Sequence, residues 1–353
     1  MLAMALKELR QLARDRRTVA MMVILPVVLL VVFGYAARFD IDKVSTIVAG
    51  PAAETVKTRL PSQLDVVATH TDWGRDQGVD ALRRADATVV VLADPQHPAI
   101  LVDGANLFGA QSVLRGLAGQ PSLPKPEVLF NPTLATSVVM VPGLMGMILV
   151  FIGTVATSLG VVRERQSGTL EQLAVMPFRP RDVFLGKILP YFGVAIVDLV
   201  IVVFAGLWIF GVPFNGSPWI FAIGAVLFLF VALGMGVLIS TVSENQGQAI
   251  QLAIMTLLPQ ILLSGLIFPL DSVAIGVRWI GYLLPLTYFV QIARGVMVRA
   301  APFDSLLVPM GMLLLLGVIV FGLSVLRFGR DLAPAGSGGS HGPNPASQPE
   351  AAA

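Results

Sequence analysis

The segment best suited to specific chemistry is a charged stretch between two long apolar runs. It reads RERQSGTLEQLAVMPFRPRDVFLGK and covers residues 163–187. Ser167 or Thr169 can cap a helix that has Glu171 in its first turn, and Pro177 would stop that helix. Such a short charged projection suits docking into another protein. A loop that only sets membrane topology has the same pattern, and the residues alone leave both interpretations open.

The usual catalytic and metal-binding patterns are missing from the sequence. The chain has no cysteine, and its three histidines, His70, His97 and His341, all lie outside the apolar runs, with no HExxH pattern. The Gly-Lys pair at 186–187 is followed by isoleucine and lacks the upstream glycine of a phosphate-binding loop. We therefore predict no catalytic residue, metal or cofactor in this chain, and any ATP would have to be bound by another subunit.

One acid, Asp198, lies well inside an apolar run. A charge at the centre of a bilayer costs at least a few kcal/mol. Lys187 precedes it on a similar helix face but roughly 16 Å away along the axis, too far for a direct ion pair. Asp198 is either a polar point on a substrate or proton path, or a hydrogen-bonding group between packed helices, and the second interpretation is favoured.

The composition is that of a membrane protein. Of 353 residues, 55% are hydrophobic and only 13% are charged, whereas soluble domains carry about 25% charged residues. The net charge of +2 does not indicate nucleic-acid binding. A span needs about 20 apolar residues, and small residues recur within the apolar runs, which permits close helix packing. The sequence predicts six transmembrane helices, at 18–37, 134–162, 188–211, 219–243, 245–270 and 304–326.

The distribution of Lys and Arg predicts the orientation. Basic residues gather in 1–17, in 163–187 and after the last span, and short basic segments stay on the cytoplasmic side. With six spans, both termini and the 163–187 loop are then cytoplasmic, and residues 38–133 are outside. The 18–37 run is longer than the apolar part of a signal peptide, so we expect it to be retained.

Residues 38–133 have the composition of a soluble α/β domain. Short apolar runs that suit strands alternate with helical stretches such as GVDALRRAD; the runs are STIVAG, LDVVAT, ATVVVLA, AILVDG and EVLF. In the segment VDGAN, Asp103 or Asn106 is a plausible helix cap. A ligand-binding role for Asp103 is the less favoured alternative.

Three further segments have distinct patterns. Residues 1–17 have apolar residues at helical spacing with basic residues on another face, which predicts an amphipathic helix at the inner membrane surface. It is either a basic anchor or a lever for a cytoplasmic partner. Residues 271–303 are amphipathic and interrupted by proline, which predicts outer re-entrant or interfacial helices. Residues 333–353 are rich in Gly, Pro and Ser, which predicts a disordered tail.

The 163–187 segment resembles the shared motif of ABC-2 type transporter permeases, a Glu-Arg-Glu-x-Gly-Thr-x-Glu-x-Leu run followed by Pro and Gly-Lys. LVDGAN, GKILPYFGVAIVD, LISTVSENQGQA and LPLTYFVQIARGV also resemble blocks of the subgroup with a large external domain after the first span. The resemblance covers about residues 1–330. It implies that the ATPase-coupling element contains Arg163, Glu164, Arg165, Gly168, Thr169, Glu171, Leu173, Pro177, Gly186 and Lys187.

The resemblance also implies a function. The chain would be the permease subunit of an ATP-driven exporter in the bacterial cytoplasmic membrane, moving a hydrophobic or amphipathic molecule such as a drug or lipid outward. It would act as a homodimer or a heterodimer with a related permease, in contact with membrane lipid, and a separate ATPase subunit would bind ATP and Mg. Candidate residues of the substrate path are Asp198, Met140, Met147, Phe151, Met255 and Leu258.

Two other functions are compatible with a membrane protein of this organisation. In the first, the external α/β domain captures a ligand and the chain is a membrane-anchored binding or sensor protein. In the second, the chain is an intramembrane enzyme, which would need a His, Ser-Lys or metal constellation that the spans lack. The first remains the main alternative.

Overall fold

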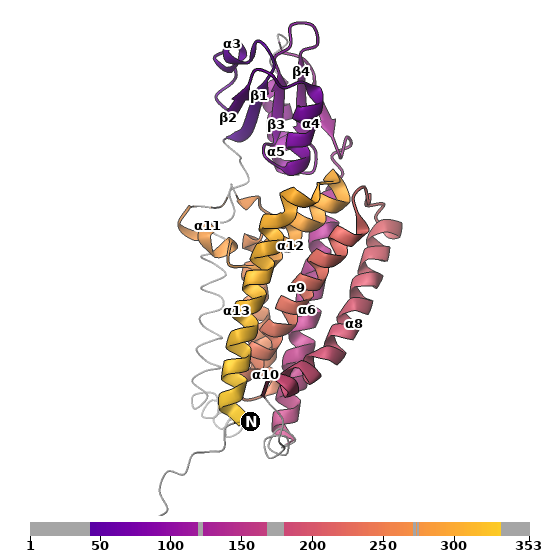
Figure 1. Cartoon of the computed structure of the whole chain (residues 1–353), viewed down its shortest axis with the longest axis vertical. Helices are drawn as coiled ribbons and strands as arrows, with labels where there is room; N and C mark the ends of the chain where they lie inside the picture. Colours follow the sequence, from indigo (N-terminus) through magenta and orange to yellow (C-terminus); the bar gives the residue numbers. More distant parts are fainter. Residues whose placement is uncertain (1–42, 119–122, 168–179, 271–272, 274, 333–353) are drawn as a thin grey trace, which may run out of the picture.

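A computed structural model of the protein places a small α/β domain at one end of a helical bundle (Figure 1). This confirms the predicted class, a mostly helical membrane protein with an α/β domain. The structure describes residues 43–118, 123–167, 180–270, 273 and 275–332. The predicted amphipathic helix at 1–17, the first span at 18–37 and the tail at 333–353 therefore lie outside the described residues.

The α/β domain contains a five-stranded sheet with the order β2-β1-β3-β4-β5. The pairs β1–β2, β1–β3 and β4–β5 are parallel, and β3–β4 is antiparallel. Each of the five apolar runs noted in the sequence contributes one strand. The strands are β1 (Val44–Ala49), β2 (Leu64–His70), β3 (Val89–Leu92), β4 (Ala99–Asp103) and β5 (Pro126–Leu129).

Helices cover both faces of this sheet, because alternate strand residues point to opposite sides. Val89 and Val91 of β3 join one apolar cluster, which includes residues of α3 (Ala53–Lys57) and α5 (Leu107–Leu117). Val90 and Leu92 join the other, beneath α4 (Arg75–Arg84). The domain is thus a three-layer sandwich, and its entirely apolar strand β3 is the buried central strand.

Within the described residues, four helices are long and apolar enough to cross a membrane. They are α6 (Thr136–Gln166), α8 (Pro180–Ile209, of which 188–209 is the apolar part), α9 (Pro218–Val242) and α13 (Leu307–Leu332, apolar together with the short helix before it). They run roughly side by side below the α/β domain (Figure 1).

Helix α10 (Gln246–Leu263) occupies most of the predicted fifth span but is not among those four. Its 18 residues give a length of roughly 27 Å, close to the thickness of the hydrocarbon core. Several glutamines lower its hydropathy, and the helix ends where Ser264 and Gly265 break the pattern. Gly265 has a φ of 81°, which is in the left-handed region that favours glycine.

The helices continue past the apolar runs into the charged segment. Helix α6 extends to Gln166, and α8 begins at Pro180, so both ends of the 163–187 segment are helical. The reason is local: Arg, Glu and Gln are good helix formers, and a proline at the first helical position does no harm.

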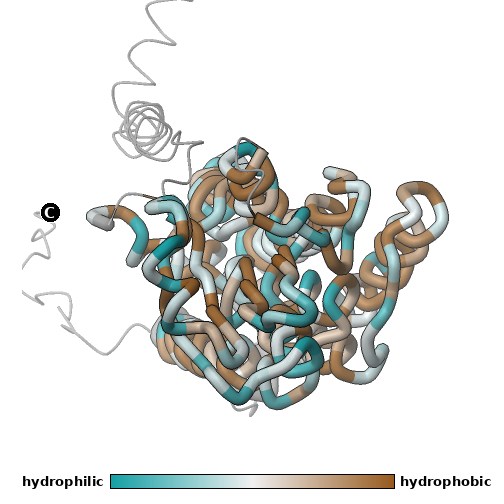
Figure 2. The backbone as a smooth tube through the Cα atoms, turned by 90° about the horizontal axis from the view of Figure 1, so that it is seen from above, coloured by the Kyte–Doolittle hydropathy of each residue, from teal (hydrophilic) through white to brown (hydrophobic). Residues whose placement is uncertain are grey.

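The chain between α10 and α13 forms short helices next to the α/β domain. These are α11 (Ile275–Gly281), α12 (Pro285–Arg294), the π-helix η2 (Gly295–Arg299) and the 3₁₀-helix η3 (Phe303–Leu306). Helix α12 is buried against α6, α9 and α13. Seen from above, hydrophilic and hydrophobic stretches alternate along the tube of the chain (Figure 2).

The bundle core lies between α6, α9 and α12. Phe228 of α9 stacks on Phe289 of α12 with ring centroids 4.4 Å apart. Helices α6 and α9 approach closely because small residues face each other: a Cβ on Gly236 would lie 2.7 Å from the carbonyl oxygen of Thr154. Helix α8 packs less fully, with side chains such as Trp208 and Ile209 exposed by 84% and 74%. This exposed face is suited to lipid or to a second subunit.

Candidate functional site

The most elaborate polar structure lies where the α/β domain meets the helical bundle. Arg299, the last residue of η2, donates from Nε and from a terminal nitrogen to Asp103 Oδ2, at 2.9 and 2.7 Å. The side chain of Asp103 is 2% exposed and that of Arg299 13%. The other carboxylate oxygen of Asp103, Oδ1, accepts a hydrogen bond from the Ala105 backbone N–H. A buried charge pair of this kind depends strongly on both partners.

A second, exposed ion pair joins the same two parts of the molecule. Arg84 at the end of α4 donates to the carboxylate of Asp304 in η3, and also to Asp80 on its own helix. Ion pairs on both strand β4 and helix α4 therefore dock the α/β domain onto the segment between α12 and α13.

Arg294, the last residue of α12, links three parts of the bundle. Its guanidinium donates to the carbonyl oxygens of Val139, Gly265 and Leu266 at 2.9, 2.9 and 2.8 Å. The carbonyls of Gly265 and Leu266 lie beyond the end of α10, where no helical N–H reaches them. Burial and the nearby Arg299 lower the pKa of Arg294 to about 10, so it remains charged at neutral pH.

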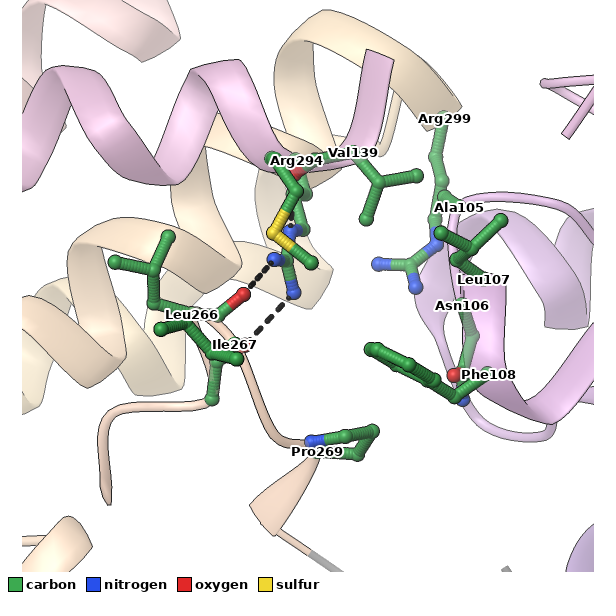
Figure 3. Close-up of a pocket in the computed structure, with 12 residues that line it drawn as sticks. Ala105, Asn106, Leu107, Phe108, Val139, Leu266, Ile267, Pro269, Arg294 and Arg299 are labelled. Atoms are coloured by element: carbon green, nitrogen blue, oxygen red, sulfur yellow. Dashed lines mark hydrogen bonds between the residues drawn. The ribbon is translucent and has the colours of Figure 1, made fainter. Parts of the chain in front are cut away.

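These groups surround a cavity of about 120 Å³, which we call the junction cavity. The guanidinium groups of Arg294 and Arg299 point toward the space between Leu266, Ile267, Pro269 and Phe108 (Figure 3). Its lining comes from the loop after β4 with the first turn of α5, from α6, from the segment after α10, and from α12 and η2; the residues are Ala105, Asn106, Leu107, Phe108, Val139, Met140, Gly265, Leu266, Ile267, Pro269, Arg294 and Arg299.

The two polar residues of the segment VDGAN therefore have different structural roles. Asn106 is the N-cap of α5, because its side-chain oxygen accepts from the Gly109 N–H at 3.2 Å. Asp103 instead closes the turn before the helix and holds Arg299. The sequence predicted Asp103 or Asn106 as the cap, and the structure confirms Asn106. The sequence did not indicate the ionic partner of Asp103, which is 196 positions away.

The predicted coupling residues are only partly described. Arg163, Glu164 and Arg165 form the last turn of α6, and Gly186 and Lys187 lie in the second turn of α8. The others, Gly168, Thr169, Glu171, Leu173 and Pro177, lie outside the described residues, so the predicted helix in this segment stays a prediction. Ser167, one of the two candidate caps for that helix, is the C-terminal cap of α6, and its hydroxyl donates to the Glu164 carbonyl.

Arg165 ties the end of α6 to the connection between α9 and α10. It donates to the carbonyl oxygens of Ser240 and Ser243, both at 3.2 Å. Next to it, Gln246 of α10 donates to the side chain of Gln166 at 3.2 Å. These carbonyls lie at the end of α9, where helix carbonyls lack partners, so a cation is favourable there. The end of α6, which leads into the predicted ATPase-coupling segment, is thereby fixed to two other helices.

The candidate path residues do not form one site in the described structure. Asp198 is partly exposed on α8 and has no hydrogen bond to another described residue. The predicted hydrogen bond from Asp198 to a packed helix is therefore not seen among the described residues. Met140 lines the junction cavity. The rest are partly buried or exposed on α6 and α10, two helices in contact: Met147, Phe151, Met255 and Leu258.

Sequence reasoning missed Arg294 and Arg299 as functional candidates. A signal was present, since both arginines interrupt the apolar segment QIARGVMVRAAP, and charged residues in apolar surroundings need partners. Their partners come from distant strands and helices, which no local pattern identifies.

Comparison with known proteins identifies the family. The model of the ABC-2 family transporter protein matches residues 16–326. The chain is 29% identical to the probable multidrug ABC transporter permease YbhS of Escherichia coli, over 94% of this chain and 97% of that one. It is 26% identical to YbhR, also named a probable multidrug ABC transporter permease of E. coli, over 84% and 89%. The inner membrane transport permease YhhJ of E. coli is 32% identical over 56% of this chain and 54% of its own. The chain therefore belongs to the ABC-2 family of transporter membrane proteins.

Proposed function

We propose that this chain is the permease subunit of an ATP-driven exporter in the bacterial cytoplasmic membrane. The observation that carries the proposal is the family match, which extends over residues 16–326 and includes the described membrane helices except the C-terminal end of α13. The substrate is a hydrophobic or amphipathic molecule, drug-like or lipid. The names of YbhS and YbhR as probable multidrug permeases support this class of substrate.

In this proposal the α/β domain lies outside and the opposite ends of the helices lie in the cytoplasm. The supporting feature is the position of the basic residues. Arg163 and Arg165 at the end of α6, Lys187 in α8 and Arg327 near the end of α13 all belong to helix segments remote from the α/β domain (Figure 1). Basic residues next to spans are retained in the cytoplasm. The two termini are then cytoplasmic as well.

A separate ATPase subunit binds ATP and Mg²⁺ and pushes on the segment between α6 and α8. Arg165 and Gln166 support this part of the proposal. The hydrogen bonds of Arg165 link the end of α6 to the end of α9, and the Gln166–Gln246 hydrogen bond links it to α10. Two copies of the chain, or this chain and a related permease, enclose the substrate path. The candidate path residues are Asp198 on α8 and five side chains on α6 and α10, which are Met140, Met147, Phe151, Met255 and Leu258.

The proposal is tested by reversing one charge in the coupling segment. We expect Glu171→Arg to weaken assembly with the ATPase subunit and to uncouple ATP hydrolysis from transport, because the acid would contact the ATPase. The measurement is co-purification of this chain with the ATPase encoded next to it, with stoichiometry, bound ATPase activity and export recorded.

Glu54→Arg is the matched control, since Glu54 is exposed on α3 in the α/β domain and makes the same change of charge. A complex of two permeases and two ATPases that weakens only with Glu171→Arg would support the proposal. Unchanged assembly and transport would contradict the coupling role of the segment, and no bound ATPase in the unsubstituted chain would contradict the exporter itself.

A specific cavity favours a second function, ligand binding by the α/β domain. A space of about 510 Å³ lies at the carboxyl ends of β1 and β3, lined by Gly50, Trp73, Arg75, Asp94 and His97 among others. The chain leaves β1 toward β2 and leaves β3 toward β4, so this is a topological switch point, where open α/β sheets bind ligands. The domain can thus act as a binding module, alone or as part of an exporter.

This second function is tested by the fluorescence of Trp73. In a chain whose Trp208, Trp219 and Trp279 are replaced by phenylalanine, Trp73 is the remaining tryptophan. We expect an amino acid or sugar from a panel to change its emission saturably, and Arg75→Ala to abolish the change. No response to the whole panel would leave the domain without this role.

A further inference from the structure

Among the described residues, the lining of the junction cavity carries an unbalanced positive charge. These lining residues include two arginines and no acidic residue. Arg299 is compensated by Asp103 beside the cavity, whereas Arg294 binds neutral backbone carbonyls within the described part of the chain. A buried cation without a counter-charge is costly. The cavity is therefore electrostatically prepared for one negative charge.

Hydrogen-bond donors remain for such a charge. A guanidinium has five N–H groups, and the bonds of Arg294 to Val139, Gly265 and Leu266 use three of them. Arg299 directs Nε and one terminal nitrogen to the same oxygen of Asp103, which leaves its other terminal nitrogen with further N–H groups. Both guanidinium groups point toward the cavity (Figure 3).

The first turn of α5 adds to this arrangement. Leu107 and Phe108 lie in that turn and line the cavity. Their backbone N–H groups have no acceptor within the helix, and the cap Asn106 accepts from Gly109 instead. The positive end of the helix dipole faces the same space as the arginines, which strengthens its preference for an anion.

We propose that the junction cavity is an anion-binding site that takes one phosphate or carboxylate group, held by Arg294, Arg299 and the first turn of α5. The volume of about 120 Å³ suits a group of this size and excludes a whole lipid or drug molecule. The apolar residues at its edge, Phe108, Ile267 and Pro269, suit the carbon chain attached to such a group. The proposal does not depend on the chain being an exporter.

The test uses the full chain in detergent micelles and its melting temperature. One arm adds inorganic phosphate, with sodium chloride at equal ionic strength as control. The other arm adds phosphatidylglycerol, with phosphatidylcholine as control. We expect phosphate or phosphatidylglycerol to raise the melting temperature saturably where its control does not. A response to phosphate alone identifies a free anion, and a response to phosphatidylglycerol alone identifies a lipid headgroup.

Variants that place a carboxylate in the cavity test whether that response arises there. Met140→Glu and Phe108→Glu supply the missing carboxylate, and Met140→Gln and Phe108→Gln change the side chains similarly without the charge. We expect the Glu variants to bind the anion at least about tenfold more weakly than their Gln partners, since the arginines are then occupied. The second pair serves if one position fails to fold. Equal responses in Glu and Gln variants, or no response in the unsubstituted chain, would overturn the proposal.

Discussion

At the scale of single residues, the junction depends on a few charged side chains that are each held by specific partners. Asp103 is the clearest, because it closes the turn before α5 with one oxygen and holds Arg299 with the other. The exposure of 2% for Asp103 and 13% for Arg299 leaves little water to replace either partner. Loss of one member leaves a buried charge, while loss of both does not.

The expected result for Asp103→Asn is a loss of about 3 kcal/mol in the free energy of unfolding, because Arg299 is left without its carboxylate. Replacing Arg299 by Met as well is expected to recover most of that loss. Chemical denaturation of the detergent-solubilised chain measures both variants. A double variant no better than Asp103→Asn would mean that the ion pair is not what the junction loses.

At the scale of secondary-structure elements, close approach between helices determines which residues can be changed. Helices α6 and α9 contact through Gly236, where an added Cβ would lie 2.8 Å from Cβ of Thr157 as well as close to the Thr154 carbonyl. Thr154 also donates to the Ala232 carbonyl across the same contact. Backbone atoms form part of this contact, so the neighbours cannot rotate away.

Gly236→Ala is therefore expected to destabilise the bundle by about 1–3 kcal/mol through overpacking, although alanine is the better helix former. Gly311→Ala in α13 is the matched control, since no atom lies within 4 Å of the added Cβ, and it is expected to be neutral or slightly stabilising. Thermal unfolding of both variants in detergent gives the comparison. Equal melting temperatures would show that α6 and α9 can separate without cost.

At the scale of the whole molecule, two parts of different composition are held together by ion pairs. The apolar bundle and the α/β domain each have their own core. Arg299–Asp103 and Arg84–Asp304 connect them, and Arg294 braces the bundle directly beneath. A displacement of α12 or η2 therefore reaches the α/β domain through charged side chains, which makes the docking sensitive to pH.

The exposed pair sets the expected pH dependence. The pair of Arg84 and Asp304 needs an ionised carboxylate, so it stabilises docking above the usual carboxyl range of about 4 and is lost in acid. We expect hydrogen-exchange protection of η3 and of the end of α4 to fall in acid. Asp304→Asn is expected to reduce that protection at neutral pH and to remove its pH dependence.

Glu127→Gln is the control for this prediction. Glu127 pairs with Arg75 inside the α/β domain, and the hydrogen bond from Arg75 lowers the pKa of Glu127. Neither residue has an ion pair with η3 in the described part of the chain. The same loss of protection in both variants would attribute the effect to the α/β domain as a whole rather than to its docking.

Local patterns in the sequence were sufficient for the class of protein, the described apolar helices, the five strands and the Asn106 cap of α5. Hydropathy, strand alternation and turn residues act over a few neighbouring positions, so they can be read from the chain alone. They also predicted the charged segment between α6 and α8, whose central residues lie outside the described part of the chain.

Only the tertiary structure decided the junction. Asp103 and Arg299 are separated by 196 positions, and Arg294 meets Val139 across 155. Their contacts exist because α12 packs on α6 and because the segment after α10 leaves helical geometry at Gly265. Backbone carbonyls without helical partners, two arginines and the first turn of α5 therefore lie around one cavity. The residue types alone determine that a buried charge needs a partner. The packing of elements that are distant in the sequence determines which residue becomes that partner.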